Sequence, residues 1–262
     1  MKTLGVNFVR ELLAKGRYVF TRAEAASALG RQGGTLSSTL LRLKRGGWVW
    51  PLGGDFFTIV DPANRGFGTI PPEWFLDDWA RFRGVEYYIG GLSAAAMHGA
   101  AHQAPQVLQI AVNRAIRPFR LPSLRVQFLY PGRIEPEAYE TRQVPSGWVR
   151  FSTPAVTAYD LLALRKACPS LDHAATVYRE LGEAIRPTKL AALCGMATET
   201  GVLQRLGWML DHTGWESLTG LLAKRLEKRP RYWVPLRPDL PRRGDRNVKW
   251  RLIENTDIQP DI

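Results

Sequence analysis

Residues 21–60 read TRAEAASALG RQGGTLSSTL LRLKRGGWVW PLGGDFFTIV, and this stretch decides the fold of the N-terminal part of the chain. It opens with Thr21 and Glu24, which at this spacing form a capping box, the signature of a helix start. The alanine-rich run that follows predicts a helix to Leu29. Gly30 then ends this helix, because glycine readily adopts the left-handed conformation of a helix C-cap.

A second helix and a hairpin follow within the same stretch. Gly33 and Gly34 mark a turn, and Thr35 can cap a helix that runs to Arg45. Aromatic and β-branched residues then flank a turn-forming segment at 51–55, which predicts a β-hairpin. The order helix, turn, helix, hairpin is the outline of a winged helix-turn-helix, an architecture that binds DNA.

The charge of the chain favours an anionic partner. The 262 residues carry a formal net charge of +12, and a hydrophobic content of 45% is typical of a globular protein. The excess is uneven, since residues 1–62 hold nine Lys/Arg against four Asp/Glu and residues 228–251 hold nine against two. Basic surfaces attract nucleic acid through steering and counterion release, so we expect DNA as a partner.

The second helix of the motif has the two faces that a recognition helix needs. Leu36, Leu40 and Leu43 recur at helical spacing and form its buried stripe. The other side holds short hydroxyls, which allow close approach, and cations, which bind phosphates or guanine edges. The predicted DNA-binding residues, with two in the preceding turn, are Arg31, Gln32, Thr35, Ser37, Ser38, Arg42, Lys44 and Arg45. The alternative for this face is a solvated surface in a winged-helix module that binds protein.

The hairpin is expected to act as the wing. Gly53 and Gly54 allow a tight tip that can enter a minor groove, although the cationic content of the hairpin is low. We expect Trp48, Trp50 and Phe57 in the core rather than against DNA bases.

The remainder of the chain predicts a second, larger domain. A polar, turn-rich segment at 61–68 marks the boundary. It separates a winged helix-turn-helix domain over 1–62, begun by a helix at 3–15, from a mixed α/β domain with a helical C-terminal half over 63–262. The fold class is therefore α+β. Strands are expected at 107–112, 124–130 and 148–151, and helices at 73–83, 92–101, 171–185, 187–196, 201–212 and 215–228, with a further helix capped by Thr153.

The segment 242–251, near the C-terminus, combines cations with a tryptophan. Basic and aromatic side chains together are typical of nucleic-acid surfaces, and they also suit an acidic partner. On this interpretation Arg242, Arg243, Arg246 and Lys249 contact phosphates or a partner. The alternative is a docking strand whose apolar residues pack on the domain while its charges face water. The two interpretations are compatible.

The pattern favours no catalytic or metal site, so we expect neither a cofactor nor enzymatic activity. His98 and His102 have the spacing of a helical metal pair but lack the adjacent glutamate and a third ligand. Ser93 follows two glycines without forming a phosphate loop or a nucleophile elbow, and it suits a helix cap. An enzyme with its active site near Ser93 and His98 remains the alternative from another class.

The cysteines and the N-terminus point to the cytoplasm. Cys168 and Cys194 fall in apolar helical patterns, as reduced core thiols do. The N-terminus lacks a signal pattern, and no segment has the ~18 apolar residues of a membrane span. We therefore expect a cytoplasmic protein without a membrane partner.

Several motifs occur in a characteristic order along the chain. They are FTRAEAA at 20–26, YYIGGLSAAAMHGA at 87–100, FSTPA at 151–155 and GDRNVKWRLIEN at 244–255. In this order they resemble the AbiEi antitoxins of bacterial type IV toxin–antitoxin systems, which are known from abortive phage infection. The resemblance covers nearly the whole length.

The resemblance implies two activities. The winged helix would bind inverted repeats in the promoter of its own operon and repress transcription. The C-terminal domain would neutralise a cognate nucleotidyltransferase-like toxin without a stable complex. The chain is thus expected to be an antitoxin and transcriptional autorepressor that serves in phage defence. Two alternatives stay open: a winged-helix regulator with a ligand-sensing C-terminal domain, and an enzyme that acts on the toxin.

Overall fold

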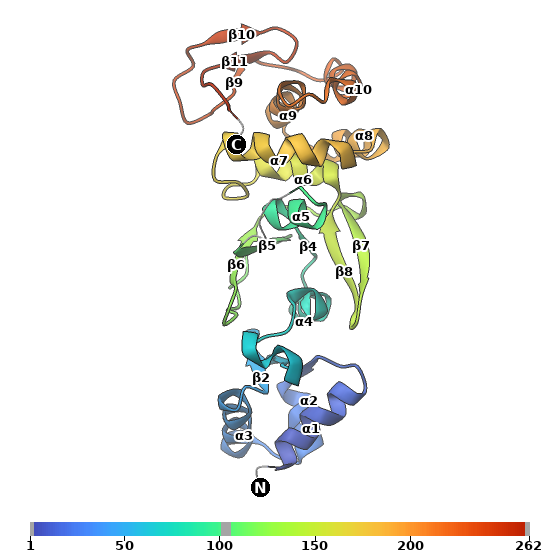
Figure 1. Cartoon of the computed structure of the whole chain (residues 1–262), viewed down its shortest axis with the longest axis vertical. Coiled ribbons are helices and arrows are strands. Elements are labelled where there is room, and N and C mark those ends of the chain that lie inside the picture. The colour runs from blue at the N-terminus through green and yellow to red at the C-terminus, as the bar shows by residue number, and fades with distance from the viewer. Residues whose placement is uncertain (1–2, 101–105, 260–262) are drawn as a thin grey trace.

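Three helices and a small sheet form the N-terminal part of the computed structural model, which describes residues 3–100 and 106–259 (Figure 1). The helices are α1 (Thr3–Ala14), α2 (Arg22–Leu29) and α3 (Gly33–Arg45), and the strands are β1 (Val19–Thr21), β2 (Val49–Pro51) and β3 (Phe56–Ile59). The strands form an antiparallel sheet in the order β1-β3-β2, with Phe20 opposite Phe57.

The predicted start of α2 is confirmed in detail. The Thr21 hydroxyl accepts from the Glu24 amide, and the Glu24 carboxylate accepts from the Thr21 amide. Gly30 ends the helix in the left-handed conformation, with φ of 59°. The predicted cap of α3 at Thr35 is wrong by three residues, because Gln32 is the N-cap and Gly33 already begins the helix. Gly33 has a φ of 54°, which glycine adopts without a steric penalty.

The first core lies between these helices and the sheet. Phe8 and Phe20 meet edge to face, and Phe20 stacks on Phe57 at a centroid distance of 5.3 Å. The predicted stripe of α3 lies in this core, where Leu36, Leu40 and Leu43 are all buried.

A five-stranded mixed sheet forms the centre of the molecule. Its strands are β4 (Tyr87–Ile89), β5 (Val107–Val112), β6 (Arg125–Leu129), β7 (Tyr139–Val144) and β8 (Gly147–Ser152), in the order β6-β5-β4-β8-β7. Alternate side chains along β4 enter two different cores, as the period of two requires. Tyr87 and Ile89 pack with the helix α4 (Leu76–Arg83), and Tyr88 packs with the helical layer on the other face.

The short α5 (Gly91–Met97), which follows β4 directly, lies on that other face of the sheet, and five further helices stack from there outward (Figure 1). They are α6 (Pro154–Ala163), α7 (Leu171–Leu181), α8 (Pro187–Met196), α9 (Thr200–His212) and α10 (Glu216–Leu226). The predicted cap is confirmed, since the Thr153 hydroxyl accepts from the Val156 amide with Pro154 at the first helical position. Short 3-10 turns occupy Pro62–Phe67, Pro72–Trp74, Pro136–Ala138 and Gly182–Ala184.

The C-terminal segment forms a third sheet that packs on α9. Its strands are β9 (Val234–Pro235), β10 (Asp245–Asn247) and β11 (Leu252–Glu254), in the order β10-β11-β9. Trp250, in the turn before β11, is completely buried. Figure 1 shows this sheet and α3 at opposite ends of the long axis of the molecule.

Two strands of the central sheet were not predicted, and the expected helix at 92–101 is shorter. β7 alternates poorly because Glu140, Thr141, Arg142 and Gln143 are all polar and it lies at the sheet edge. β4 is a three-residue strand that is buried throughout, so it has no alternation to detect. The C-terminal end predicted for the helix after it, Ala101, lies outside the described residues.

The N-terminal elements and the central sheet share buried side chains. Leu52 and Phe56 of the β2–β3 hairpin belong to the same hydrophobic cluster as Trp79 of α4. The division at residue 62 stays a prediction, and the observed packing joins the two parts across it.

Candidate nucleic-acid interface

The outward face of α3 carries the predicted DNA-binding residues. Thr35, Ser37, Ser38, Arg42, Lys44, Arg45 and the preceding Gln32 are exposed, whereas Arg31 is half-buried. The leucines of the same helix face the first core. The helix therefore offers hydroxyls and cations to solvent from a rigid, well-packed element.

Some of these side chains also make bonds within the protein. The Arg22 guanidinium donates to Ser37 Oγ at 2.5 Å, and Arg42 Nε donates to the Ser38 carbonyl at 3.1 Å. Arg31 Nη1 donates to Thr39 Oγ1 at 2.7 Å, which ties the turn to α3. These bonds restrict the rotamers of the face before any ligand arrives, which lowers the entropic cost of binding.

Two tryptophans beside α3 carry cations on their rings. The Arg65 guanidinium lies 3.7 Å from the Trp48 ring centroid, and the Arg10 guanidinium lies 5.5 Å from it. Lys44 Nζ lies 4.8 Å from the Trp50 ring centroid. Both tryptophans are half-buried, so their expected place in the core is only partly correct. They hold positive charge around the C-terminal end of α3.

Leu41 lies at the centre of this face and was not predicted as part of it. Its exposed fraction is 47%, and it follows Ser37 by four residues and precedes Arg45 by four. Residues four apart are neighbours on a helix surface. The sequence could have indicated Leu41, because its position along the helix places it outside the buried leucine stripe.

The β2–β3 hairpin packs against α4, while Gly54 and Asp55 at its tip stay exposed. Phe56 stacks on Phe82 with a centroid distance of 4.7 Å, and Leu52 is completely buried. A Cβ on Gly54 would lie 3.5 Å from the Phe82 ring. The expectation that Gly53 and Gly54 enter a minor groove stays a prediction, and α4 of the second part of the chain contacts the tip from one side.

The cations of the C-terminal segment lie at the other end of the molecule from α3 (Figure 1). Arg242, Arg243, Arg246 and Lys249 are all exposed. The Arg246 guanidinium lies 5.2 Å from the Trp233 ring centroid. Lys249 Nζ forms an ion pair with Asp211 at 2.6 Å and contacts Thr219, so it fastens the segment to α9 and α10. The structure thus does not bring the two predicted cationic groups together.

Contacts from one side of α9 hold the C-terminal segment in place. Trp250 Nε1 donates to Asp211 at 2.6 Å, and Trp208 Nε1 donates to Glu254 at 2.6 Å. The Gln204 amide donates to the backbone carbonyls of Tyr232, Trp250 and Arg251. The interpretation of this segment as a docking strand therefore holds for its apolar residues, which pack on the domain, while its arginines face solvent.

Ser93 and His98, the candidates for an enzymatic site, bond to the backbone of the central sheet. Ser93 Oγ accepts from the Gln109 amide at 2.9 Å and donates to the Val107 carbonyl. His98 Nε2 lies 2.7 Å from the Ser152 carbonyl, so this nitrogen carries the proton. Burial lowers the pKa of His98, which favours its neutral form.

The expected cap role of Ser93 is wrong, because Gly90 is the N-cap of α5. His102 lies outside the described residues. In the parts of the chain that the structure describes, no group of three His, Cys, Asp or Glu side chains is arranged to hold a metal ion.

A buried carboxyl joins the central sheet to the helical layer. Asp160 of α6 is 2% exposed and accepts a hydrogen bond from the Tyr88 hydroxyl of β4 at 2.9 Å. Burial raises the pKa of Asp160 to about 7, because removal from water disfavours the charged form.

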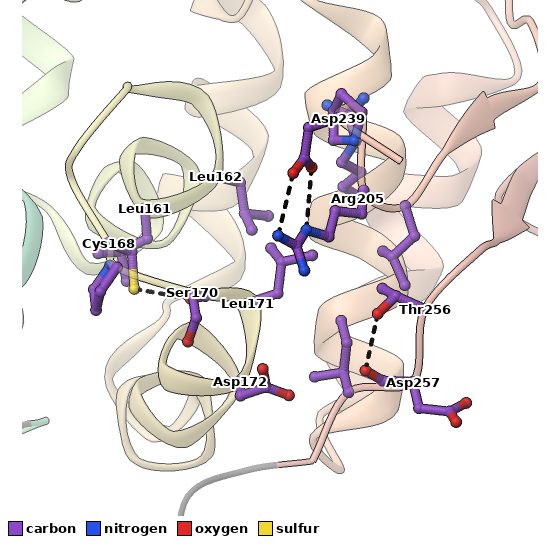
Figure 2. A pocket seen from close by; sticks show the side chains of 15 residues that line it. Leu161, Leu162, Cys168, Ser170, Leu171, Asp172, Arg205, Asp239, Thr256 and Asp257 are labelled. Atoms are coloured by element: carbon purple, nitrogen blue, oxygen red, sulfur yellow. Dashed lines mark hydrogen bonds and ion pairs between the residues drawn. The ribbon is translucent and has the colours of Figure 1, made fainter. Parts of the chain in front are cut away.

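A pocket of about 300 Å³ lies between the helical layer and the docked C-terminal segment (Figure 2). Its polar groups bond mainly to one another or to nearby backbone. Arg237 pairs with Asp239 at 3.1 Å, Cys168 Sγ donates to the Ser170 carbonyl, and Arg205 Nε donates to the Pro235 carbonyl. The pocket exists because residues 236–239 and 256–258 close over α9 and the α6–α7 connection.

No helix within residues 3–100 and 106–259 has the length and apolar character that crossing a membrane requires.

Together these features define an α+β protein with a cationic helix at one end and, at the other, a helical layer completed by its own C-terminal strands. Residues 88–212, from β4 to the end of α9, match the family model of the AbiEi antitoxin C-terminal domain. The resemblance is therefore confirmed over residues 88–212, which support an AbiEi family antitoxin. The match supports an antitoxin role in a toxin–antitoxin system.

The fold has a relative among solved structures. The RV2827C protein from Mycobacterium tuberculosis superposes with a TM-score of 0.68 at 16% sequence identity. The match covers 96% of this chain and 91% of that protein, so the two share a fold over nearly their whole length. No curated protein sequence matches the chain at a significant level.

Proposed function

We propose that the protein is an antitoxin that also represses its own type IV toxin–antitoxin operon, with its N-terminal part acting as a winged helix-turn-helix. The observation that carries the DNA-binding half is α3, which buries Leu36, Leu40 and Leu43 and exposes hydroxyl and cationic residues along its other side. Such a helix fits the major groove, where arginine reads guanine and hydroxyls approach base edges.

Repression would be steric. The protein would occupy inverted repeats in its own promoter and exclude RNA polymerase. Arg42, Lys44 and Arg45 would supply phosphate or base contacts, and Ser37 and Ser38 would allow close approach. Affinity should fall steeply with salt, because each neutralised phosphate releases bound counterions.

Neutralisation would be the task of the second part of the chain. The AbiEi domain supports this half of the proposal, and the toxin would be nucleotidyltransferase-like, as in the family. The exposed Arg242, Arg243 and Arg246 offer a cationic surface to that toxin at the far end from α3. On this proposal both activities take place in the cytoplasm, without a membrane partner.

A gel shift with the upstream promoter tests the DNA-binding half. The full-length chain should shift this fragment, and Arg42→Ala with Arg45→Ala should abolish the shift. The matched control is Arg242→Ala with Arg243→Ala, which removes the same charge far from α3 and should leave the shift intact. A wild-type chain that does not prefer its own promoter to a scrambled duplex would contradict the proposal.

Co-expression with the adjacent toxin gene tests the other half. The Arg42/Arg45 variant should still rescue growth, because the contacts of α3 are not needed for neutralisation. A folded variant that loses rescue together with DNA binding would show that one surface serves both activities, against the proposal.

A further inference from the structure

The connection from β5 to the first residue of β6, called here the 113–125 loop, is strongly cationic. Residues 113–125 read NRAIRPFRLPSLR, with four arginines and no acidic residue, and all four arginines are exposed. Phe119 and Leu121 of this loop are buried, and Phe119 meets Trp79 of α4 edge to face at 5.0 Å. The buried residues fix the loop on the protein, so the arginines between and beside them are held at the surface.

The loop is joined to the N-terminal part next to α3. Trp50 Nε1 of β2 donates a hydrogen bond to the Arg120 carbonyl at 2.6 Å. The same indole ring carries Lys44 of α3 at 4.8 Å. The boundary segment approaches the loop as well, since a Cβ on Gly68 at its end would lie 3.1 Å from Pro122. Lys44, Trp50 and Arg120 therefore form one continuous surface between the recognition helix and the loop.

Three of the arginines surround a common hollow. A surface depression of about 450 Å³ is lined by Arg117, Arg120 and Arg125, and no carboxylate is among its lining residues. Arg114 has a different role, since its Nη2 donates to the Arg83 carbonyl at 2.7 Å and anchors the base of the loop. Guanidinium groups gathered in this way suit phosphate oxygens, which accept their paired N–H donors.

We propose that the 113–125 loop is a second arm of the DNA interface, in which Arg117, Arg120 and Arg125 contact backbone phosphates of the duplex that receives α3. The inference rests on the proposed DNA-binding function. It commits to duplex DNA because the loop continues the surface of α3 through Trp50. The loop also lies beside the hairpin, because Trp50 of β2 bonds to its backbone.

Binding of the full-length chain to its upstream promoter, measured by fluorescence anisotropy over a range of salt concentrations, tests the arm. For the triple variant Arg117→Ala, Arg120→Ala, Arg125→Ala we expect an affinity at least about tenfold weaker and a slope of log K against log salt lower by about 2–3. The preference for the operator over a scrambled duplex should persist, because phosphate contacts carry no base information.

Two further variants control for charge and folding. Replacing the same three residues with lysine keeps the charge and should restore most of the salt slope. Arg242→Ala, Arg243→Ala, Arg246→Ala removes the same charge at the far end of the molecule and should leave affinity and slope unchanged. Circular dichroism of the alanine variant should match that of the wild type, because all three side chains are exposed.

A trimmed operator distinguishes the phosphates of the duplex from free phosphate. A duplex that ends at the α3 site should bind the wild type as weakly as the alanine variant binds the full operator, with no further loss for the variant. Wild-type affinity and salt slope in the folded alanine variant would overturn the arm, and so would full competition by inorganic phosphate at the arginines. Failure of the wild type to bind the operator would instead overturn the proposed function itself.

Discussion

The indole ring of Trp250 fills the space beside Gly207 of α9 where the Cβ of any larger residue would lie. The ring is completely buried, and its nitrogen donates to Asp211 one helical turn further along α9. The glycine and the aspartate thus form a seat for one side chain of the C-terminal segment.

Gly207→Ala should therefore destabilise the protein. The new methyl overlaps the Trp250 ring, and overpacking of a filled core costs about 1–3 kcal/mol. Urea unfolding measures the loss. Gly220→Ala is the matched control, because among the described residues nothing besides its chain neighbours and the backbone of α10 lies within 4 Å of a Cβ on Gly220. At position 220 alanine should raise the free energy of unfolding by as much as about 1 kcal/mol, because its helix propensity is higher than that of glycine. Equal effects of the two changes would contradict the seat.

Stability should depend on pH through Asp160. Burial raises its pKa from 3.8 to about 7 in the folded state. Between these values the folded chain binds more protons than the unfolded chain, so the free energy of unfolding falls as pH rises from about 4 to about 7. Asp160→Asn cannot ionise, and it should remove a dependence on the order of 2–4 kcal/mol.

Urea unfolding at several pH values within that window checks this. The Tyr88 hydroxyl can still donate to the asparagine carbonyl, so the variant should remain folded. Asp245→Asn, at an exposed site, should keep the wild-type profile. A profile for Asp160→Asn parallel to that of the wild type would show that the carboxyl does not control the dependence.

Leu41 should contact thymine if α3 enters a major groove. An apolar side chain among hydroxyls and cations suits the thymine 5-methyl, the apolar group of that groove. Leu41→Ala should weaken operator binding about fourfold, from roughly 0.8 kcal/mol for one buried methyl group.

Replacing operator thymines one by one with deoxyuridine, which lacks the methyl, identifies the contact. One thymine should matter for the wild type and not for Leu41→Ala. If the effects of Leu41→Ala and of deoxyuridine on the free energy of binding simply add at every thymine, the contact is contradicted. Ser38→Ala serves as a comparison on the same face. Its loss of affinity when thymine is replaced with deoxyuridine should equal that of the wild type.

Ser93→Ala and His98→Ala should each retain toxin neutralisation in co-expression. Their side chains bond to the backbone at Gln109, Val107 and Ser152, so the changes should cost stability, about 1–3 kcal/mol each. Thermal unfolding measures that cost. A variant of wild-type stability that no longer neutralises would favour catalysis at this position.

The local structure of the chain could be predicted well where short-range physics decides it. The capping box at Thr21, the glycine at position 30 and the leucine stripe of α3 depend on neighbours within one or two helical turns. The exposure of Arg42 and Arg45 followed from the same periodicity. The helix at Pro187–Met196 was predicted to the residue, because Pro187 marks its first turn.

The remaining features depend on pairs that are far apart in the sequence. The bond between Trp50 and Arg120 joins residues 70 positions apart, and nothing local marks Arg120 as a neighbour of α3. Lys249 was predicted to contact phosphate or a partner because its charge is visible in the sequence. Its pairing with Asp211, 38 positions earlier, is not visible there. The hairpin tip likewise gave no sign that Phe82 would cover it.

The seat on α9 has a consequence for biosynthesis. Translation proceeds toward the C-terminus, so α9 is made before the strands that complete its surroundings. The helical layer cannot close until the Trp250 region has left the ribosome and folded back onto Gln204 and Asp211. A nascent chain interrupted before that point would present the Gly207 surface bare, as a target for chaperones and proteases.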